Sequence, residues 1–241
     1  MITNHTGIAP TETWGVIGGM GPIASAEFLK TIYEQVKAKQ EQEAPVVILV
    51  SDPTFPDRTE CFLSNQKEAL LRQLHATLLR LDSFQVTKII ICCVTIHYLL
   101  PLLPEELKRK IVSLLDLALS SVVETGRKHL LLCSTGSRQM RLFENHDLWE
   151  KAEHLIAMPS EEDQDAIHTL IYRLKVNSQS PDDLDFLYSL MARYEVDSFI
   201  AACTEIHLLS RQLRHSGRSE IHCVDPLMIL ADRIVENGSS S

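Results

Sequence analysis

The chain has 241 residues and a formal net charge of −9, from 23 basic and 32 acidic side chains. This length suffices for one large domain or two modest ones, and the acidic balance argues against nucleic acid or an anionic membrane surface as the main partner. No apolar run approaches the roughly 18 residues that a membrane span needs.

The six cysteines show neither a disulfide-like spacing nor a C-x-x-C pair that would indicate a structural metal. The N-terminal segment is polar and lacks the hydrophobic core of an export signal. We therefore expect reduced thiols and no metal site in a cytoplasmic protein.

Strands and helices are expected to alternate along the chain, which is typical of an α/β protein with mostly parallel sheets. Short apolar runs predict the strands, and apolar residues recurring at helical spacing predict the helices. The expected strands are residues 14–17, 45–50, 89–92, 130–133, 155–158, 199–202 and 221–224. The expected helices are residues 24–39, 67–81, 105–124, 160–175, 185–194, 208–214 and 226–235. A polar lead (residues 1–12) and a polar tail (238–241) flank them.

A short segment of sequence occurs twice, each time after an expected buried strand. The first copy starts at Cys93 and reads CVTIHYLL, and the second starts at Cys203 and reads CTEIHLL. Cysteine, isoleucine, histidine and leucine recur at matching positions without a gap. The repeat predicts two pseudo-symmetric α/β domains, which we place at residues 13–102 with 216–241 and at residues 103–215.

The loops of unusual composition all follow expected strands. They are residues 18–22, 52–59, 93–95, 134–137 and 203–205. Ligands of open α/β sheets bind at the carboxyl ends of the strands, so Cys93 and Cys203 are expected to approach one cleft between the domains from opposite sides. Two facing thiols could form a disulfide, or they could take a proton from one face of a carbon and return one to the other. A thiol at a helix start has a lowered pKa, which suits the second role.

The chain resembles the aspartate/glutamate racemase family over nearly its whole length from Trp14 onward. The resemblance rests on five motifs in register: Gly18–Pro22, Pro56–Thr59, the Cys93 segment, Pro159–Lys175 and Cys203–Ile206. It implies an amino-acid racemase that needs no cofactor such as pyridoxal phosphate. It also implies catalytic thiols at Cys93 and Cys203 and, in many members, a homodimer.

The resemblance further implies that Arg58 and Lys175 hold the two carboxylates of an acidic amino acid, aspartate or glutamate. The predicted substrate-binding residues are Met20, Gly21, Arg58, Thr59, Thr95, Thr135, Ser137, Lys175, Thr204 and Glu205. Simpler roles stay open for three of them. Arg58 could be a surface charge of its loop, Lys175 could offset a helix dipole, and Glu205 could cap a helix or tune Cys203.

The first copy of the repeat departs from the family. Members usually have Cys-Asn-Thr-Ala-His where this chain has Cys93-Val94-Thr95-Ile96-His97. The asparagine normally binds polar groups of the substrate, and a lost hydrogen bond to a charged group is worth roughly 1.5–3 kcal/mol. Val94 and Ile96 therefore indicate either a less polar substrate or a weakened or repurposed member. The alternatives are a decarboxylase, isomerase or lyase on the same fold, or a binding protein that kept the site.

Other features of the sequence have more ordinary interpretations. Cys92 is expected on the opposite face of its strand from Cys93, as a small core residue. His97 and His207 fit a structural role as well as an acid–base role. The segment from Gly19 to Ala24 also meets a loose form of the dinucleotide-binding fingerprint, but a proline within it is unusual.

Overall fold

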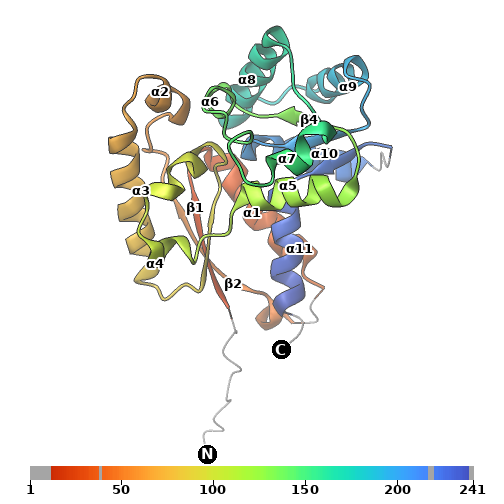
Figure 1. The fold of residues 1–241 in the computed structure, drawn as a ribbon. Coiled ribbons are helices and arrows are strands. Elements are labelled where there is room, and N and C mark those ends of the chain that lie inside the picture. The colour runs from red at the N-terminus through yellow and green to blue at the C-terminus, as the bar shows by residue number, and fades with distance from the viewer. Residues whose placement is uncertain (1–11, 38–39, 217–219, 239–241) are drawn as a thin grey trace, which may run out of the picture.

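The structure is a computed structural model that describes residues 12–37, 40–216 and 220–238. It contains two parallel β-sheets, one in each half of the molecule (Figure 1). The first sheet has the strand order β2-β1-β3, and the second has the order β5-β4-β6-β7. The strands are β1 (Thr13–Gly18), β2 (Val46–Ser51), β3 (Lys88–Ile91), β4 (His129–Leu132), β5 (Ile156–Ala157), β6 (Ser198–Ala201) and β7 (His222–Val224). The predicted α/β fold is confirmed, whereas the expected lead and tail lie almost entirely outside the described residues.

Helices pack around both sheets. The α-helices are α1 (Pro22–Gln35), α2 (Arg58–Leu63), α3 (Lys67–Asp82), α4 (Glu105–Lys108), α5 (Leu114–Thr125), α6 (Thr135–Gln139), α7 (Trp149–Ala152), α8 (Glu161–Lys175), α9 (Asp183–Arg193), α10 (His207–Ser216) and α11 (Pro226–Gly238). Short 3₁₀ helices are η1 (Glu41–Glu43), η2 (Thr95–Leu102), η3 (Glu153–Leu155) and η4 (Thr204–Ile206). Within the described residues, no helix is both long and apolar enough to cross a membrane.

Local sequence explains where several helices begin and end. Pro22 occupies the first turn of α1, where its missing N–H leaves no hydrogen bond unmade. The side chains of Ser113, Ser134 and Ser160 cap α5, α6 and α8 by accepting a backbone N–H three residues on. Gly126 ends α5 with a φ of 61°, a conformation that glycine adopts without strain.

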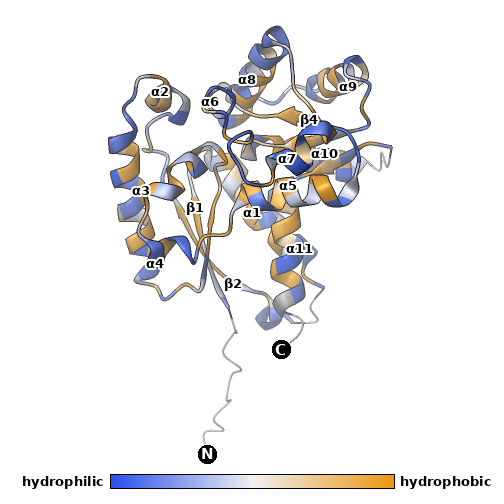
Figure 2. Ribbon diagram, viewed as in Figure 1, coloured by the Kyte–Doolittle hydropathy of each residue, from blue (hydrophilic) through white to orange (hydrophobic). Residues whose placement is uncertain are grey.

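The core consists of three apolar clusters, because alternate residues of a strand face opposite sides of its sheet. The central cluster is shared by both sheets and by α1, α5 and α11; it includes Trp14, Val16, Phe28, Ile90, Cys92, Val94, Leu119, Leu131, Ile200, Ala202 and Leu230. The first outer cluster includes Ile17, Leu74, Ile91, Cys93 and Ile96. The second outer cluster includes Leu132, Ile171, Phe199, Ala201, Cys203 and Ile206. Figure 2 shows apolar strands and helices with one apolar side.

The last strand differs from the sequence prediction, which grouped it with the first domain. β7 pairs in parallel with β6, with Phe199 opposite Cys223, and so extends the second sheet. Helix α11 then packs against α1 and α5, and its Leu227 and Leu230 enter the central cluster. Strand β7 therefore supplies backbone partners that the open edge of β6 would otherwise lack.

The expected helix at residues 105–124 is also wrong in its middle. Residue Ile111 forms a parallel bridge with Ile89 of β3, whose N–H donates to the carbonyl of Lys110 at 2.7 Å. The carbonyl of Ile89 in turn accepts the N–H of Val112 at 2.8 Å. β-Branched Ile111 and Val112 favour extended backbone, and Ser113 then starts α5. The bridge satisfies the edge of β3 that would otherwise stay open.

Candidate active site

The two repeated cysteines stand at equivalent places in the two halves. Cys93 follows β3 and Cys203 follows β6, and each side chain is 5% exposed. The residue before each cysteine, Cys92 or Ala202, points into the central cluster. Cys93 and Cys203 therefore face away from that cluster, each at the carboxyl end of its sheet. The prediction that Cys92 is a core residue is confirmed.

His97 and His207, the repeated histidines, are buried and hydrogen-bonded on both ring nitrogens. The Nε2 of His97 accepts the N–H of Leu114 at 3.1 Å, so its Nδ1 carries the proton and donates to the carbonyl of Cys93 at 2.9 Å. Burial lowers the pKa of His97 to about 4, which keeps the ring neutral. His207 binds the buried carboxylate of Asp225 at 2.7 Å and the hydroxyl of Thr31 at 2.9 Å. His97 thus fixes the backbone at Cys93, whereas His207 ties the start of α10 to Asp225 and to α1.

Cys203 is hydrogen-bonded to a carboxylate. Its Sγ donates to Oε2 of Glu205 at 2.8 Å, and Thr204 Oγ1 lies 3.4 Å from the same oxygen. The other carboxylate oxygen, Oε1, is buried without a hydrogen-bond partner. Burial first, and then the charge of Glu205, raise the pKa of Cys203 well above its ordinary value. Glu205, 1% exposed, is therefore a buried acid that contacts one of the two thiols.

Arg58 is placed beside the other thiol. The predicted loop 52–59 in fact ends in a helix, because the carboxylate of Asp57 caps α2 by accepting the N–H of Glu60 at 3.1 Å. The guanidinium of Arg58 donates to the backbone carbonyls of Met20 at 2.7 Å and Pro56 at 3.1 Å. Burial opposes its charge, but electrostatic interactions with Cys93, Asp57 and Glu205 outweigh burial and raise the pKa of Arg58. Arg58 is 7% exposed and is not a surface loop charge.

Lys175 reaches the site from the last turn of α8 in the second half. Its ammonium Nζ lies 3.3 Å from Oδ2 of Asp57 and 3.7 Å from the ring centre of Tyr172. Burial favours the neutral form of Lys175, but electrostatic interactions with Cys203 and Glu205 outweigh burial and raise the pKa of Lys175. The hydroxyl of Tyr172 donates to Oδ1 of Asp57 at 2.8 Å. Asp57 thus connects α2 of the first half to α8 of the second.

Small hydroxyl side chains from η2 and from the start of α6 lie close together. The hydroxyl of Thr95 lies 3.0 Å from those of both Ser134 and Ser137, so these groups satisfy one another. By contrast, the hydroxyl of Thr135 is buried without a partner. Its backbone N–H donates to Nδ1 of His168 at 3.3 Å. Thr135 and Glu205 therefore each present a buried polar atom with no hydrogen-bond partner.

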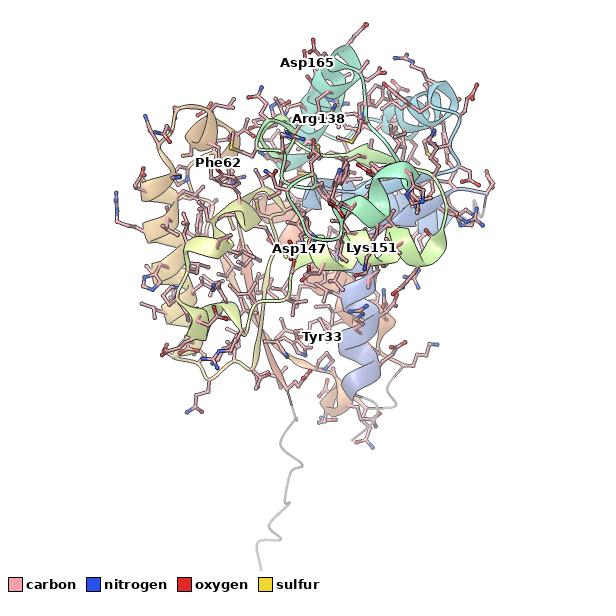
Figure 3. All side chains as sticks on the ribbon, in the orientation of Figure 1. Tyr33, Phe62, Arg138, Asp147, Lys151 and Asp165 are labelled. Carbon is pink, nitrogen blue, oxygen red and sulfur yellow. The ribbon has the colours of Figure 1, made fainter. Side chains whose placement is uncertain are left out.

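Two glycines allow these elements to approach one another. A Cβ on Gly21 would lie 2.5 Å from Oε1 of Glu205, and one on Gly136 would lie 2.8 Å from the hydroxyl of Thr59. Gly21 therefore lets the start of α1 pack against η4, and Gly136 lets α6 pack against α2. Figure 3 labels Phe62 of α2 and Arg138 of α6, which lie on the two sides of the junction between the halves.

The structure brings most of the predicted site residues together, with two differences. Met20 is buried in the first outer cluster, so it reaches the site through its backbone carbonyl. Val94 and Ile96 lie in apolar clusters, and their side chains are at most 2% exposed. Sequence reasoning missed Asp57, Tyr172 and His168 as neighbours of the site. The spacing of Tyr172 and Lys175, three residues apart on one helix face, is the signal that could have found Tyr172.

The comparison with known families fits this arrangement of two strand-end cysteines. The sequence profile of the Asp/Glu/Hydantoin racemase family matches residues 17–234. The chain belongs to this family. By that membership it is an isomerase of the amino-acid racemase class, and the resemblance stated from the five motifs is confirmed.

Solved structures of the family share the fold. The aspartate racemase of Picrophilus torridus has a TM-score of 0.79 at 22% identity, over 95% of this chain and 94% of its own. An aspartate racemase homologue from Pyrococcus horikoshii has a TM-score of 0.67 at 19% identity, over 95% and 100%. The glutamate racemase of Campylobacter jejuni has a TM-score of 0.54 at 19% identity, over 93% and 83%.

Within the described residues, no group of three or more His, Cys, Asp or Glu side chains could hold a metal ion.

Proposed function

We propose that the protein racemises an acidic amino acid, aspartate or glutamate, by proton transfer between the thiols of Cys93 and Cys203. The observation that carries the proposal is the equivalent placement of these cysteines at the ends of β3 and β6. The two sites lie near enough to interact, since Cys93 is among the groups that raise the pKa of Cys203. Two acid–base groups at one site are what inversion at a carbon requires, since removal and delivery of the proton occur on opposite faces.

The proposed steps involve only the two thiols. One cysteine, as the thiolate, removes the α-hydrogen: the C–H bond breaks and an S–H bond forms. The other cysteine, as the thiol, delivers its proton to the opposite face: its S–H bond breaks and a new C–H bond forms. Each turnover therefore inverts the carbon and exchanges the protonation states of the thiols, and the chain itself carries both protons, so no cofactor is required.

The charges near the thiols favour a dicarboxylic substrate. Arg58 is buried and Lys175 is partly buried, and each interacts electrostatically with one of the cysteines and with Glu205. Two cations suit an amino acid with two carboxylates, whereas a hydantoin ring, also named in the family description, has none. Arg58 beside Cys93 is also placed to stabilise the enolate-like charge that develops when the proton leaves.

The experiment is proton NMR in D₂O with each enantiomer of aspartate, glutamate and a 5-substituted hydantoin. We expect loss of the α-proton signal for aspartate or glutamate, and chiral analysis of the same sample should show the mirror-image acid. Cys93→Ala and Cys203→Ala should each abolish racemisation, and Cys61→Ala, which removes a buried thiol elsewhere in α2, should not. Full activity in either of the first two variants would disprove the mechanism. A product other than the mirror image would select another reaction on the same fold.

The resemblance also predicts a homodimer, and the cysteine spacing with the polar N-terminal segment predicts a cytoplasmic protein; both stay predictions.

A further inference from the structure

We propose that His207 positions the segment that carries Cys203 and Glu205, and that it does so as the cationic half of a buried ion pair with Asp225. The pair clamps the start of α10 to α1 and to the start of α11. The positioning role rests on the proposed function, whereas the charge of the ring does not.

The hydroxyl of Thr31 shows which groups donate around the ring. Its Oγ1 lies 2.8 Å from the carbonyl of Glu27 and 2.9 Å from Nε2 of His207. It also accepts a hydrogen bond from the guanidinium of Arg211. The single proton of the hydroxyl belongs on the bond to the Glu27 carbonyl, since two oxygens at this distance without a proton between them would repel each other. The two lone pairs then accept from Arg211 and from Nε2 of His207, which therefore carries a proton.

The other ring nitrogen, Nδ1, faces the carboxylate of Asp225 at 2.7 Å. Oδ1 of this carboxylate accepts the backbone N–H groups of Leu227 and Met228 at 3.0 and 3.3 Å, which favours the ionised form. Burial by itself would raise the pKa of Asp225, but the interactions with His207 and Met228 outweigh burial and lower it. An ionised carboxylate can only accept, so Nδ1 is protonated as well. With a proton on both nitrogens, the ring of His207 is an imidazolium.

Charged groups from three elements surround this ring. Asp225 follows β7 and contacts the ring directly, and both side chains are at most 1% exposed. Arg211, one turn further along α10, is matched by two carboxylates of α1: its Nε lies 3.0 Å from Glu27 and its Nη2 lies 2.8 Å from Glu34. The charge of Arg211 is therefore offset by α1, which leaves Asp225 to balance the cation of His207.

His97, the equivalent residue of the repeat, is in the opposite state. Its Nε2 accepts the N–H of Leu114, so this nitrogen has no proton, and burial lowers the pKa of His97 to about 4. Both of its ring nitrogens contact backbone groups, whereas His207 contacts a carboxylate. The repeat thus supplies a neutral histidine to the first half and a charged one to the second.

The ion pair lies directly behind the second thiol in the chain. His207 is the first residue of α10, and the short helix η4 before it carries Glu205 and follows Cys203. Through Thr31 the ring holds α1, and Gly21 at the start of α1 packs against Oε1 of Glu205. His207 therefore acts through the backbone, and it fixes where Cys203 and Glu205 lie relative to the first half.

The charge is tested by NMR of the protein labelled with ¹⁵N in its histidine rings. At about pH 8, where an ordinary histidine is neutral, we expect His207 to keep a directly bonded proton on both ring nitrogens. His97 should show one protonated and one bare nitrogen in the same spectrum and is the internal control. The signals are assigned by their loss in His207→Gln and His97→Gln. A bare nitrogen on His207 would overturn the ion pair.

Two further observations keep this test decisive if His207→Gln does not fold. Asp225→Asn removes the carboxylate charge, so it should convert the doubly protonated ring into one with a bare nitrogen. A wild-type spectrum in which every histidine ring has a bare nitrogen would contradict the proposal without any variant.

The positioning role is tested by the kinetics of His207→Gln, whose amide can still hydrogen-bond but carries no charge. We expect kcat, referred to the folded fraction, to fall about tenfold or more. KM should stay nearly unchanged, because Arg58 and Lys175 lie on other elements. The double variant His207→Gln/Asp225→Asn should be no slower than the slower single variant, since the two side chains act as one pair. An unchanged kcat, or effects of the two changes that simply multiply, would contradict the positioning role.

Thiol reactivity separates positioning from a general loosening of the fold. Limiting iodoacetamide, followed by peptide mass spectrometry, should alkylate Cys203 faster in His207→Gln than in the wild type, and Cys93 at the wild-type rate. Buried Cys92 and Cys133 are the references for the rest of the core. Equal acceleration of all these thiols would overturn the specific role of His207.

The outcomes separate the two proposals. A doubly protonated His207 in a protein that racemises no acidic amino acid would refute the proposed function and keep the ion pair. Racemisation by a protein whose His207 has a bare nitrogen would do the opposite.

Discussion

Lys175 and Asp57 form an ion pair that joins the two halves, with 3.3 Å between the ammonium and the carboxylate. The two side chains are only 17% and 23% exposed, so water screens the pair incompletely. Asp57 also accepts the hydroxyl of Tyr172 and caps α2. One carboxylate therefore links the helix that carries Arg58 to the helix that carries Lys175.

Replacing Asp57 should separate its two roles. Asp57→Asn keeps a capping oxygen but loses the ion pair, and we expect it to reduce the free energy of unfolding by about 1–2 kcal/mol. Asp57→Ala also loses the cap and should cost about 1 kcal/mol more. Urea denaturation of the three proteins measures both steps. Equal stability of the Asn and Ala variants would show that the cap contributes nothing.

The pH dependence of this pair has a definite sign. Burial by itself would raise the pKa of Asp57, but the charge of Lys175 acts in the opposite direction and the pKa is lowered. The pair therefore contributes its full stabilisation above the ordinary carboxyl range near pH 4, and this is lost as the pH falls through the lowered pKa of the folded state. The difference between wild type and Asp57→Asn should accordingly shrink below about pH 4.

Gly21→Ala should lower both the activity and the stability of the protein. The new Cβ would lie 2.5 Å from Oε1 of Glu205, while the backbone of Gly21, with a φ of −112°, accepts alanine without strain. We expect a loss of racemase activity of about tenfold or more, with unfolding changed by only about 1–2 kcal/mol. Activity assays and denaturation on the same preparation measure the two effects.

Gly136→Ala is the matched comparison, because its Cβ would meet Thr59 at 2.8 Å and leave Glu205 untouched. The rate at which iodoacetamide alkylates the thiol of Cys203 should therefore change in Gly21→Ala and stay constant in Gly136→Ala. A Cys203 rate that responds equally to both changes would contradict the specific contact between Gly21 and Glu205.

Val94→Asn should destabilise the protein. The Val94 side chain is 2% exposed and packs in the central cluster, so an amide there loses its hydrogen bonds to water. We expect a cost of about 1–3 kcal/mol. Val94→Ala removes the same apolar contacts without burying an amide and serves as the control. An Asn variant that is as stable as wild type and more active would show that the amide turns towards the substrate.

His97 should make the protein sensitive to mild acid. Burial lowers its pKa to about 4 from an ordinary value near 6.5, so the unfolded chain binds a proton that the folded chain excludes. Stability is therefore fully present above about pH 6.5 and should fall by about 2 kcal/mol between pH 6.5 and pH 5 for this ring. Buried His129, whose pKa is also lowered to about 4 by burial, should contribute similarly.

Urea denaturation at several pH values measures this loss. His97→Gln removes one of the rings whose pKa burial lowers, and it should reduce the loss of stability in this range by about 2 kcal/mol. A variant with the same slope as wild type would show that His97 does not stay neutral in the folded state.

Local sequence predicted the order of elements well, because strands and helices differ in the period of their apolar residues. It failed where a neighbour in space decided the conformation. Residues 110–112 stand between two segments of helical composition, yet they belong to no helix because Ile111 pairs with Ile89 of β3. The final strand could not be assigned to a sheet, because the free edge of β6 is a property of the folded molecule.

The candidate site divides in the same way. The repeat of Cys93 and Cys203 and the burial of Cys92 on the opposite face followed from the sequence. The resemblance to the family also predicted a site role for Arg58, which the structure shows to be buried. The interaction of Asp57 with Lys175, 118 residues apart, did not, and neither did the direction of Val94 into the core.

By itself the sequence determined that two equivalent strands would deliver two equivalent thiols, because strand period and repeat spacing are local properties of the chain. Only the tertiary structure decided which charged side chain from a distant part of the chain lies near Cys93, whereas Glu205 is two residues from Cys203 in the sequence. The charged neighbours of the two thiols are Arg58 and Glu205, which lie on different elements. Electrostatic effects depend on distance in space, and folding sets the distance between Arg58 and Cys93.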